Sequence, residues 1–319
     1  MKFTIHSFIF FIISLSMNNI LGQEFSIAFY NVENLFDTIN SKNNDNEFLP
    51  NSHKKWNKEK YEEKIKKINT VIRSIKNPII IGLCEIENKS VVEDIVNKSI
   101  LKETHEVIHY ESLDNRGIDN AIIYDKTKLN LCESGIIRIQ LPRKHAPTRD
   151  IIWAKLNHLE DTIIIMVNHW PSRYGGIKES EPKRLAAAYS AKTFIDSIMK
   201  LNPKSKILFM GDLNDYPKNI STKIISRSLK SMIKKSSGKY KGTHNYKGKW
   251  NILDHIFVSK SLLKRKGIHA KKGSGIIHSN KFLLSTYKGR VVPFRTYEGK
   301  KYLNGYSDHL PVSVKIVLE

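Results

Sequence analysis

The sequence predicts an α+β fold in which two packed β-sheets carry their helices on the outside. Short apolar runs bounded by turn residues recur along the whole chain, which is typical of strands. Few segments repeat their apolar residues at helical spacing, and few helices among many strands favour two packed sheets over a doubly wound parallel sheet. No internal repeat or low-complexity linker divides the chain. We therefore predict one domain over residues 23–319.

The predicted elements follow in chain order. The strands are the apolar runs Phe25–Tyr30, Ile79–Cys84, Ala121–Tyr124, Ile151–Leu156, Ile163–Val167, Ile207–Met210, Ile256–Val258 and Leu310–Val317. The amphipathic helices are Lys60–Ile75 and Arg184–Met199. The polar segment Asn40–His53 and the basic, glycine-punctuated segment Lys264–Gly275 are predicted to be surface loops.

Residues 1–22 predict a secretory signal peptide. The basic start Met1-Lys2 precedes the apolar run Phe8–Leu15, and Leu21-Gly22 offers a small residue for cleavage. The alternative is an uncleaved anchor, but the apolar run is too short to span a bilayer comfortably. We therefore expect a secreted or periplasmic mature chain that begins at Gln23 and keeps no stable membrane anchor.

The chain is strongly basic. Its 319 residues include 53 Lys and Arg against 31 Asp and Glu, a formal net charge of +22. The lysines are spread along the chain, so they indicate either an ordinary lysine-rich surface or contact with a polyanion. The two cysteines, Cys84 and Cys132, are too few for a disulfide-stapled mini-fold or a Cys-rich zinc module, and whether they pair stays open.

Polar side chains of a few recurring types lie at the ends of the predicted strands. They are Asn31, Glu85, His169, Asp212, Asn214, Asp254, Asp308 and His309. Apolar strands that each deliver such a side chain present a site on a rigid scaffold. Oxygen ligands without cysteine suit a hard cation such as Mg²⁺ or Mn²⁺, and two histidines near carboxylates suit acid–base roles.

These strand ends belong to an ordered set of motifs that spans essentially the whole mature chain. The motifs are YNVENLFD (30–37), LCEIEN (83–88), RGIDNAIIYD (116–125), PTRDI (147–151), VNHWPSRYGG (167–176), GDLND (211–215), GKWNILDHIFVS (248–259) and GYSDHLPV (305–312). Together they resemble the endonuclease/exonuclease/phosphatase superfamily, in particular its secreted, deoxyribonuclease-like members. The resemblance implies a four-layer α/β/β/α sandwich with two packed mixed β-sheets.

The resemblance also implies roles by matched position. The implied metal ligands are Glu85, Asn31 and Asp308. The implied catalytic residues are His169, Asp212, Asn214, Asp254 and His309, with Asp254 supporting the imidazole of His309. The implied substrate ligands are Asn31 and Arg149, and Arg173 is a further candidate because it lies in the loop after His169. Asp119 is expected to orient His169.

Three functions fit these observations. The first is a nuclease that acts on DNA or RNA, the second a phosphoesterase on inositol phosphates or phospholipid headgroups (sphingomyelinase-like), and the third a non-catalytic binding module. Every matched catalytic position keeps its expected residue type, which disfavours the third. The positive charge favours a nucleic acid substrate, because contacts from Lys and Arg to its phosphates release counterions.

We therefore expect a secreted, monomeric phosphodiester hydrolase of the endonuclease type. We expect it to depend on Mg²⁺ or Mn²⁺, with Ca²⁺ as a further candidate metal. The nearest candidate for an apolar membrane-docking loop, which a sphingomyelinase-like enzyme would use, is 282–284. The sequence leaves open DNA against RNA, and endonucleolytic against exonucleolytic action.

Overall fold

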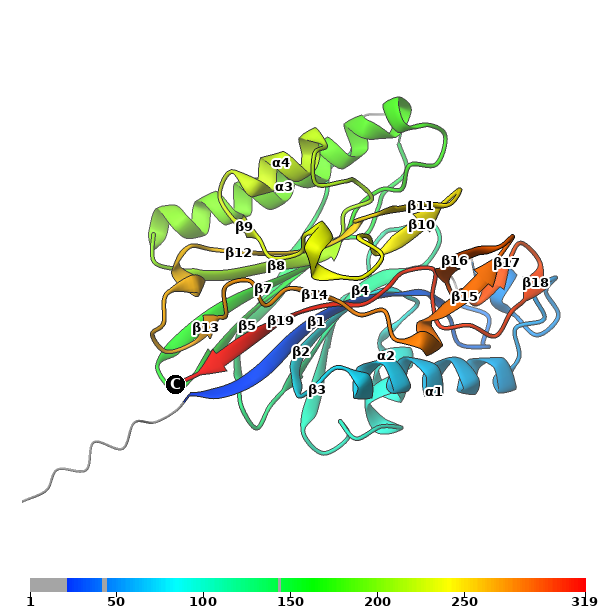
Figure 1. Cartoon of the computed structure of the whole chain (residues 1–319), viewed down its shortest axis with the longest axis horizontal. Helices are drawn as coiled ribbons and strands as arrows, with labels where there is room; N and C mark the ends of the chain where they lie inside the picture. Colours follow the sequence, from blue (N-terminus) through cyan, green and yellow to red (C-terminus); the bar gives the residue numbers. More distant parts are fainter. Residues whose placement is uncertain (1–21, 42–44, 143–144) are drawn as a thin grey trace, which may run out of the picture.

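Two mixed sheets lie face to face, with helices on both outer faces (Figure 1). The computed structural model describes residues 22–41, 45–142 and 145–319, so the predicted signal peptide lies outside the described residues except for Gly22. The first sheet has the order β13 (His269–Ala270), β19 (Val312–Leu318), β1 (Gln23–Leu35), β2 (Pro78–Ile86), β4 (Asp119–Asp125) and β3 (His105–His109), and β14 (Ile276–Ile277) also pairs with β19. The second has the order β5 (Asn130–Ile137), β6 (Ile151–His158), β7 (Asp161–His169), β8 (Lys206–Asp212), β12 (Asp254–Val258) and β9 (Lys230–Ser231).

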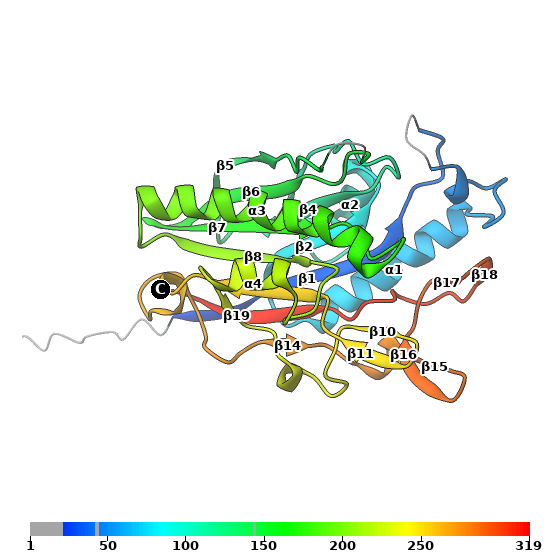
Figure 2. The ribbon, with the colours of Figure 1, turned by 90° about the horizontal axis from the view of Figure 1, so that it is seen from above.

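Four-layer architecture follows from where the helices pack. Helices α1 (Lys58–Ser74) and α2 (Lys89–Asn97) cover the first sheet, and α3 (Ile177–Leu201) and α4 (Ile220–Ser226) cover the second (Figures 1 and 2). Helix α1 begins after Asn57, whose side chain accepts a hydrogen bond from the backbone N–H of Lys60. The predicted fold class, a four-layer α/β/β/α sandwich of two mixed sheets, is confirmed.

Small antiparallel hairpins stand outside the sandwich. They are β10 (His244–Tyr246) with β11 (Lys249–Asn251), β15 (Leu284–Tyr287) with β16 (Arg290–Pro293), and β17 (Tyr297–Glu298) with β18 (Lys301–Tyr302). Short 3-10 helices occupy Asn46–Phe48, Lys235–Ser237, Ser261–Leu263 and Lys281–Leu283. The first two hairpins lie side by side at the end of the sandwich away from the C-terminus (Figures 1 and 2).

The main hydrophobic core fills the space between the sheets and under α1 and α2. Its central strands read as continuous apolar runs because both of their faces are covered, as in β2, where only Glu85 is not fully buried. A second cluster lies between α3, α4 and the outer face of the second sheet. The ends of the described chain meet on this framework, because Gln23 of β1 pairs with Leu318 of β19.

The predicted strands and helices all fall on observed ones. The loop predicted at Asn40–His53 contains a 3-10 helix whose Phe48 stacks on Phe36, and the one predicted at Lys264–Gly275 contains β13. Cys84 is buried and Cys132 exposed, and both are free thiols. Within 282–284, Leu283 is buried and Phe282 packs on Tyr306, so this segment is no exposed apolar loop. None of the described helices is long and apolar enough to cross a membrane.

Candidate active site

The strand ends that the sequence singles out meet at one edge of the two sheets. Because β1 is parallel to β2, Asn31 lies close enough to Glu85 to hydrogen bond with it. Because β7 is parallel to β8, His169 pairs with Asp212. Strand β12 is antiparallel to β8 and begins where β8 ends, so Asp254 also pairs with Asp212. The fold therefore gathers predicted site residues from both sheets.

Several residues at this edge have left-handed backbone conformations, which are unfavourable for residues other than glycine. Their φ angles are 55° at Glu33, 54° at Asn34, 61° at Glu85 and 48° at Asn214. Glu33 and Asn34 lie where the β1–β2 register shifts, after Asn31. The backbone N–H of Asn34 donates to Oε2 of Glu85 at 3.1 Å. Such conformations cost about 1–3 kcal/mol each and cluster at functional sites.

Asp212 lies at the centre of the polar cluster. Its Oδ2 accepts from Nδ2 of Asn31 at 3.1 Å, and its Oδ1 accepts from the backbone N–H of Asn214 at 2.9 Å. The Nε2 atoms of His169 and His309 lie 3.8 and 3.7 Å from the same Oδ2. Burial raises the pKa of Asp212 to about 7, against the opposing charge of His309. The carboxyl can therefore change protonation state near neutral pH.

His309 is held as an imidazolium. Its Nδ1 lies 2.8 Å from Oδ2 of Asp254, which is fully buried. Burial alone lowers the pKa of His309, but the carboxylates of Asp254 and Asp212 outweigh burial and raise this pKa well above its ordinary value. The predicted supporting role of Asp254 matches this geometry.

His169 is held neutral. Burial lowers its pKa well below the ordinary value, and the positive charges of Arg149 and Arg116 add to that effect. Its Nε2 lies 3.7 Å from Oε1 of Glu85, and its buried Nδ1 has no hydrogen-bond partner among the described residues. The two histidines of the site therefore differ in protonation state at neutral pH.

Asp119 does not orient His169, so that expectation is wrong. The Oδ2 atom of Asp119 lies 3.2 Å from Nε2 of His109, and its Oδ1 accepts from the backbone N–H of Ser112 at 2.9 Å. The side chain belongs to β4, where it fastens the segment that follows β3.

The carboxylates of Glu85 and Asp212 fit a divalent cation. One amide nitrogen, Nδ2 of Asn31, donates to Oε1 of Glu85 at 3.2 Å and to Oδ2 of Asp212 at 3.1 Å, so these two oxygens lie close together. Adjacent carboxylates repel, and a hard cation relieves that repulsion with its preferred oxygen ligands. The Oδ1 atom of Asn31 accepts from the backbone of Glu33, so a role for Asn31 as metal ligand stays a prediction.

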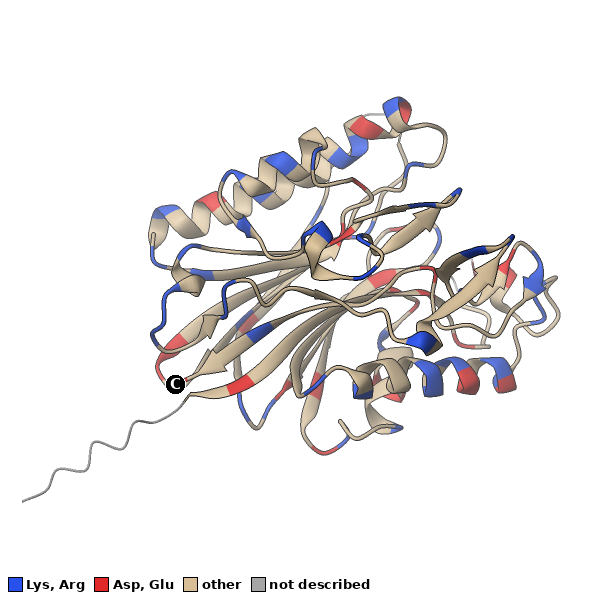
Figure 3. Ribbon diagram, in the orientation of Figure 1, with Lys and Arg blue, Asp and Glu red and all other residues tan. Residues whose placement is uncertain are grey.

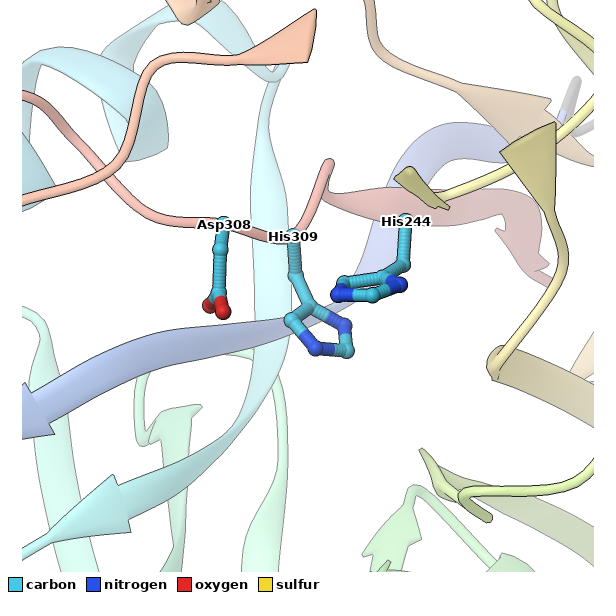
Figure 4. Close-up of side chains that lie close together, drawn as sticks. All are labelled: His244, Asp308 and His309. Atoms are coloured by element: carbon cyan, nitrogen blue, oxygen red, sulfur yellow. The ribbon is translucent and has the colours of Figure 1, made fainter. Parts of the chain in front are cut away.

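Asp308 lies on the far side of His309, in a second group. Its Oδ2 forms a 2.6 Å ion pair with Arg295, and His244 of β10 packs its ring 4.9 Å from that of His309. Figure 4 shows Asp308 and His309 on the segment before β19, with the His244 ring beside that of His309. The ligand atoms of His244, Asp308 and His309 lie within 4.8 Å of one another. Because Asp308 is paired with Arg295 and lies apart from the Glu85–Asp212 pair, its role as a metal ligand stays a prediction.

The two predicted phosphate-binding arginines are already engaged. Arg149 is 4% exposed, forms a 2.8 Å ion pair with Asp114 and donates to the backbone oxygen of Trp170 at 2.7 Å. Because its side chain is buried in these contacts, Arg149 is placed to brace the site rather than to meet a nucleic acid backbone. The Nδ2 atom of Asn214 donates to the same Trp170 oxygen at 3.0 Å.

Arg173 fastens the loop that follows β8. It donates to the backbone oxygen of Asn214 and pairs with Asp215, both at 2.8 Å, and its guanidinium stacks on Tyr216. Arg184 reaches the other oxygen of Asp215 at 2.9 Å from α3. Two arginines therefore fix the position of the loop 211–215. The guanidinium of Arg173 is occupied by these contacts, so little of it is available to a substrate.

Sequence reasoning missed two buried side chains of opposite charge beside the site, Lys64 and Glu33. Lys64 of α1 is 2% exposed and donates to the backbone oxygen of Tyr306 at 2.7 Å, and Glu33 accepts from the backbone N–H of Thr296 at 2.6 Å. Burial lowers the pKa of Lys64 to about 8 and raises that of Glu33 to about 7, and each charge opposes the shift of the other. One signal was present: Lys64 falls on the apolar face of α1, where a charged residue needs a partner.

Comparison with known proteins places this arrangement in a family. The model of the Endonuclease/Exonuclease/phosphatase family matches residues 26–318. A search of the curated proteins gave no significant match. Among solved structures, the catalytic domain of human Nocturnin with bound sulfate is 17% identical, with a TM-score of 0.59 over 93% of this chain and 95% of that one.

Two further structures share the fold. A mannosyl-6-phosphatase from Bacteroides thetaiotaomicron is 16% identical, with a TM-score of 0.59 over 92% of this chain and all of that one. TDP2 from D. rerio, complexed with a single-strand DNA product, is 13% identical, with a TM-score of 0.57 over 92% of this chain and 98% of that one. At these identities the likeness concerns the fold alone.

Proposed function

The chain belongs to the Endonuclease/Exonuclease/phosphatase family, and from this premise and the geometry of its site we propose that it is a metal-dependent phosphodiesterase acting on nucleic acid. The observation that carries the proposal is a pair of buried histidines whose Nε2 atoms lie 3.8 and 3.7 Å from the same oxygen of Asp212, with surroundings that shift the pKa of His169 down and that of His309 up. One imidazole can accept a proton while the other supplies a proton and a positive charge, as hydrolysis of a phosphodiester requires.

The proposed reaction uses the side chains as follows. Asp212 and Asn214 orient a water molecule toward the phosphorus, and the neutral His169 accepts the proton that this water loses. The bond from phosphorus to the leaving oxygen breaks as the new P–O bond forms. The imidazolium of His309 stabilises the negative charge that develops on the phosphoryl oxygens and gives its proton to the leaving oxygen.

Glu85 and Asp212 are the residues that would hold a divalent cation. Such an ion, when bound, supplies positive charge for the phosphate and lowers the pKa of water. Asn31 keeps the two carboxylates together through its amide N–H bonds. Asp254 keeps His309 protonated and fixes the orientation of its ring.

Nucleic acid is the proposed substrate because of the charge of the protein. The formal net charge is +22, and Figure 3 shows Lys and Arg on the outer helices and on the hairpins. A similar fold carries a single-strand DNA product in D. rerio TDP2, whereas another acts as a mannosyl-6-phosphatase. The fold is therefore compatible with either class of phosphoester, and the charge favours the polyanion.

The test is hydrolysis by the purified protein of plasmid DNA, RNA, inositol polyphosphates and sphingomyelin, side by side, with Mg²⁺, with Mn²⁺ and with excess EDTA. We expect cleavage of nucleic acid that EDTA abolishes. Hydrolysis confined to inositol phosphates or sphingomyelin would replace the nuclease proposal, and activity that survives EDTA would contradict the metal.

We further propose that the protein is exported and acts as a monomer. The basic and apolar start of the chain supports export. Cell fractionation, with N-terminal sequencing of the exported protein, tests this proposal, and a mature start at Gln23 is the expected result. Light scattering tests the monomer.

A further inference from the structure

A large pocket opens beside His309. Its volume is about 970 Å³, at the upper end of the range of about 300–1,000 Å³ for small-molecule sites. It lies between the β10–β11 and β15–β16 hairpins, and strands β17 and β18 complete its wall. His244 and Asp308 line it, and both adjoin His309. The pocket therefore adjoins His309 through these two residues and has room for much more than one phosphate.

The two hairpins that frame the pocket carry the same sequence at their tips. The first turns at Tyr246-Lys247-Gly248 and the second at Tyr287-Lys288-Gly289. In both, lysine and glycine have positive φ, the backbone of a tight two-residue turn. The nitrogen of each lysine lies 5.4 Å from the ring of the preceding tyrosine. Tyr246 is 60% exposed and Tyr287 is 43% exposed, so both present aromatic surface to solvent.

The hairpins are joined to each other. Arg290 of β16 donates to the backbone oxygen of Lys247 at 3.3 Å, which links the second hairpin to the first. Gly248 has a φ of 81°, which favours glycine, and a Cβ there would lie 2.2 Å from Nη1 of Arg290, so the guanidinium would have to shift. The two tyrosines and their lysines are therefore held on a connected wall rather than on independent loops.

The pocket is positively charged. Its lining contains five cationic side chains and two carboxylates, a formal net charge of +3; the cations are Lys247, Lys288, Arg290, Arg295 and Lys301, and the carboxylates are Glu298 and Asp308. Arg295 is neutralised by Asp308 at 2.6 Å. Lys247, Lys288 and Lys301 form no ion pair with any described residue, so three ammonium groups stay available to an anionic ligand.

We propose that this pocket binds the single-stranded nucleotides that flank the scissile phosphate. Exposed tyrosines offer flat faces on which unpaired bases stack, and the lysines beside them meet the phosphates, the combination that binds single strands without sequence preference. Bases stack against Tyr246 and Tyr287, and neighbouring phosphates lie near Lys247, Lys288 and Lys301. A duplex keeps its bases stacked inside and cannot use the tyrosines. This inference rests on the proposed nuclease function and specifies the form of its substrate.

The test compares two substrates of the full-length mature protein. One is a short single-stranded oligonucleotide, and the other is methyl p-nitrophenyl phosphate, a diester with no flanking nucleotide. The variants are Tyr246→Ala/Tyr287→Ala and Lys288→Ala/Lys301→Ala. Matched controls are Tyr189→Ala and Lys200→Ala, which remove an exposed tyrosine and an exposed lysine from α3. Tyr287→Phe keeps a stacking face and checks that the hairpin is intact.

We expect both double variants to lower kcat/KM for the oligonucleotide about 10-fold or more and to leave the small diester unchanged. We expect the controls and Tyr287→Phe to retain activity on both substrates. Equal losses on both substrates, or no loss on the oligonucleotide, would overturn the pocket assignment. Failure of the nuclease proposal would look different: the unmodified protein would hydrolyse the small diester and leave oligonucleotides intact.

Discussion

Asp254 is fully buried, and its carboxylate lies 2.8 Å from Nδ1 of His309. Because this carboxylate raises the pKa of His309, we expect Asp254→Asn to lower that pKa. Activity that needs the imidazolium is then lost at a lower pH than in the unmodified protein. The alkaline limb of the kcat/KM profile should move toward neutral pH, which steady-state kinetics over a pH series would measure.

His309→Ala is the reference for that experiment. Loss of the imidazolium itself should lower kcat roughly 10²-fold or more, whereas Asp254→Asn should do less harm near neutral pH. His169→Ala should resemble His309→Ala in size. If Asp254→Asn were the most damaging of the three changes, Asp254 would act on the substrate directly and the roles would have to be exchanged.

Glu85→Gln tests the metal at a single residue. The variant keeps an oxygen that can accept the backbone N–H of Asn34, so we expect it to fold. It lacks the negative charge that would hold a divalent cation, so we expect most activity to disappear at any Mg²⁺ concentration. Calorimetric titration with Mn²⁺ should show weaker binding than in the unmodified protein. A fully active Glu85→Gln protein would remove Glu85 from the metal site.

A variant at Arg149 distinguishes a structural role of this residue from a role in binding substrate. Arg149→Ala removes the 2.8 Å ion pair with Asp114 and the hydrogen bond to Trp170, and Asp114 keeps only its 3.5 Å pair with the exposed Arg116. We therefore expect a lower melting temperature and a loss on the order of 3 kcal/mol in the free energy of unfolding. The salt dependence of DNA binding should not change, because the guanidinium is already engaged. A stable variant with a shallower salt dependence would restore Arg149 as a phosphate contact.

At the scale of elements, Lys64 joins α1 to the segment between β18 and β19. Its amine donates to the backbone of Tyr306, and its charge opposes that of buried Glu33. We expect Lys64→Met to lower the free energy of unfolding by roughly 1–3 kcal/mol near neutral pH, because the hydrogen bond to Tyr306 is lost and Arg295, 3.6 Å from Glu33, is left as the cation beside that carboxylate. Urea denaturation of the variant measures this loss.

The pH dependence of that loss has a definite sign. In the folded protein the pKa of Glu33 is raised to about 7, and removal of Lys64 raises it further. The folded variant then holds a proton that the unfolded chain releases, so its stability falls as the pH rises from about 4.5 through 7. The loss should be smaller at pH 5 than at pH 8. Glu33→Gln/Lys64→Met should show little of this dependence, and an equal loss at both pH values would contradict the coupling.

Strands covered on both faces were predictable from sequence, because burial selects continuous apolar runs. This holds for β2, β7 and β8, and the polar residue at each end marked the site. Strand β5 escaped prediction because it is the edge strand of its sheet and its side chains are exposed or half-buried. Helix α2 was missed because nine residues give too few turns for a clear period.

Contacts between side chains that are far apart in the sequence were harder to predict than helices and strands. Arg149 matched a phosphate-binding position by motif and Arg173 was a candidate from its place after His169, yet their partners Asp114 and Asp215 become visible only when loops pack together. The pocket could not be predicted from the sequence either, because its wall combines the β10–β11 and β15–β16 hairpins, which lie some forty residues apart in the chain. The repeated Tyr-Lys-Gly tips were in the sequence, but only the structure shows that they face one cavity.

At the scale of the whole molecule, the net charge of +22 should appear in the salt dependence of binding. For Z phosphates on a single strand, log K falls against log salt with a slope of about −0.7Z. We expect Z of roughly 3 to 6, so the slope should be about −2 to −4. Fluorescence anisotropy of a labelled single-stranded oligonucleotide with His169→Ala protein measures binding without cleavage. If binding did not depend on salt concentration, the lysines would be ordinary surface residues. Hydrolysis of inositol phosphates or phospholipid headgroups would then be the favoured function.

The pairing of Gln23 with Leu318 has a practical consequence. Within the described residues, the start of β1 and the end of β19 lie together, at the end of the sandwich away from the hairpins (Figure 1). A tag, a bead or a fused partner attached to a mature chain that begins at Gln23, or at its C-terminus, then lies away from the pocket between the hairpins, so an immobilised protein should remain accessible to long polymers. A short linker between the two ends would also allow circular permutation, with new termini opened in an exposed loop far from the chemistry.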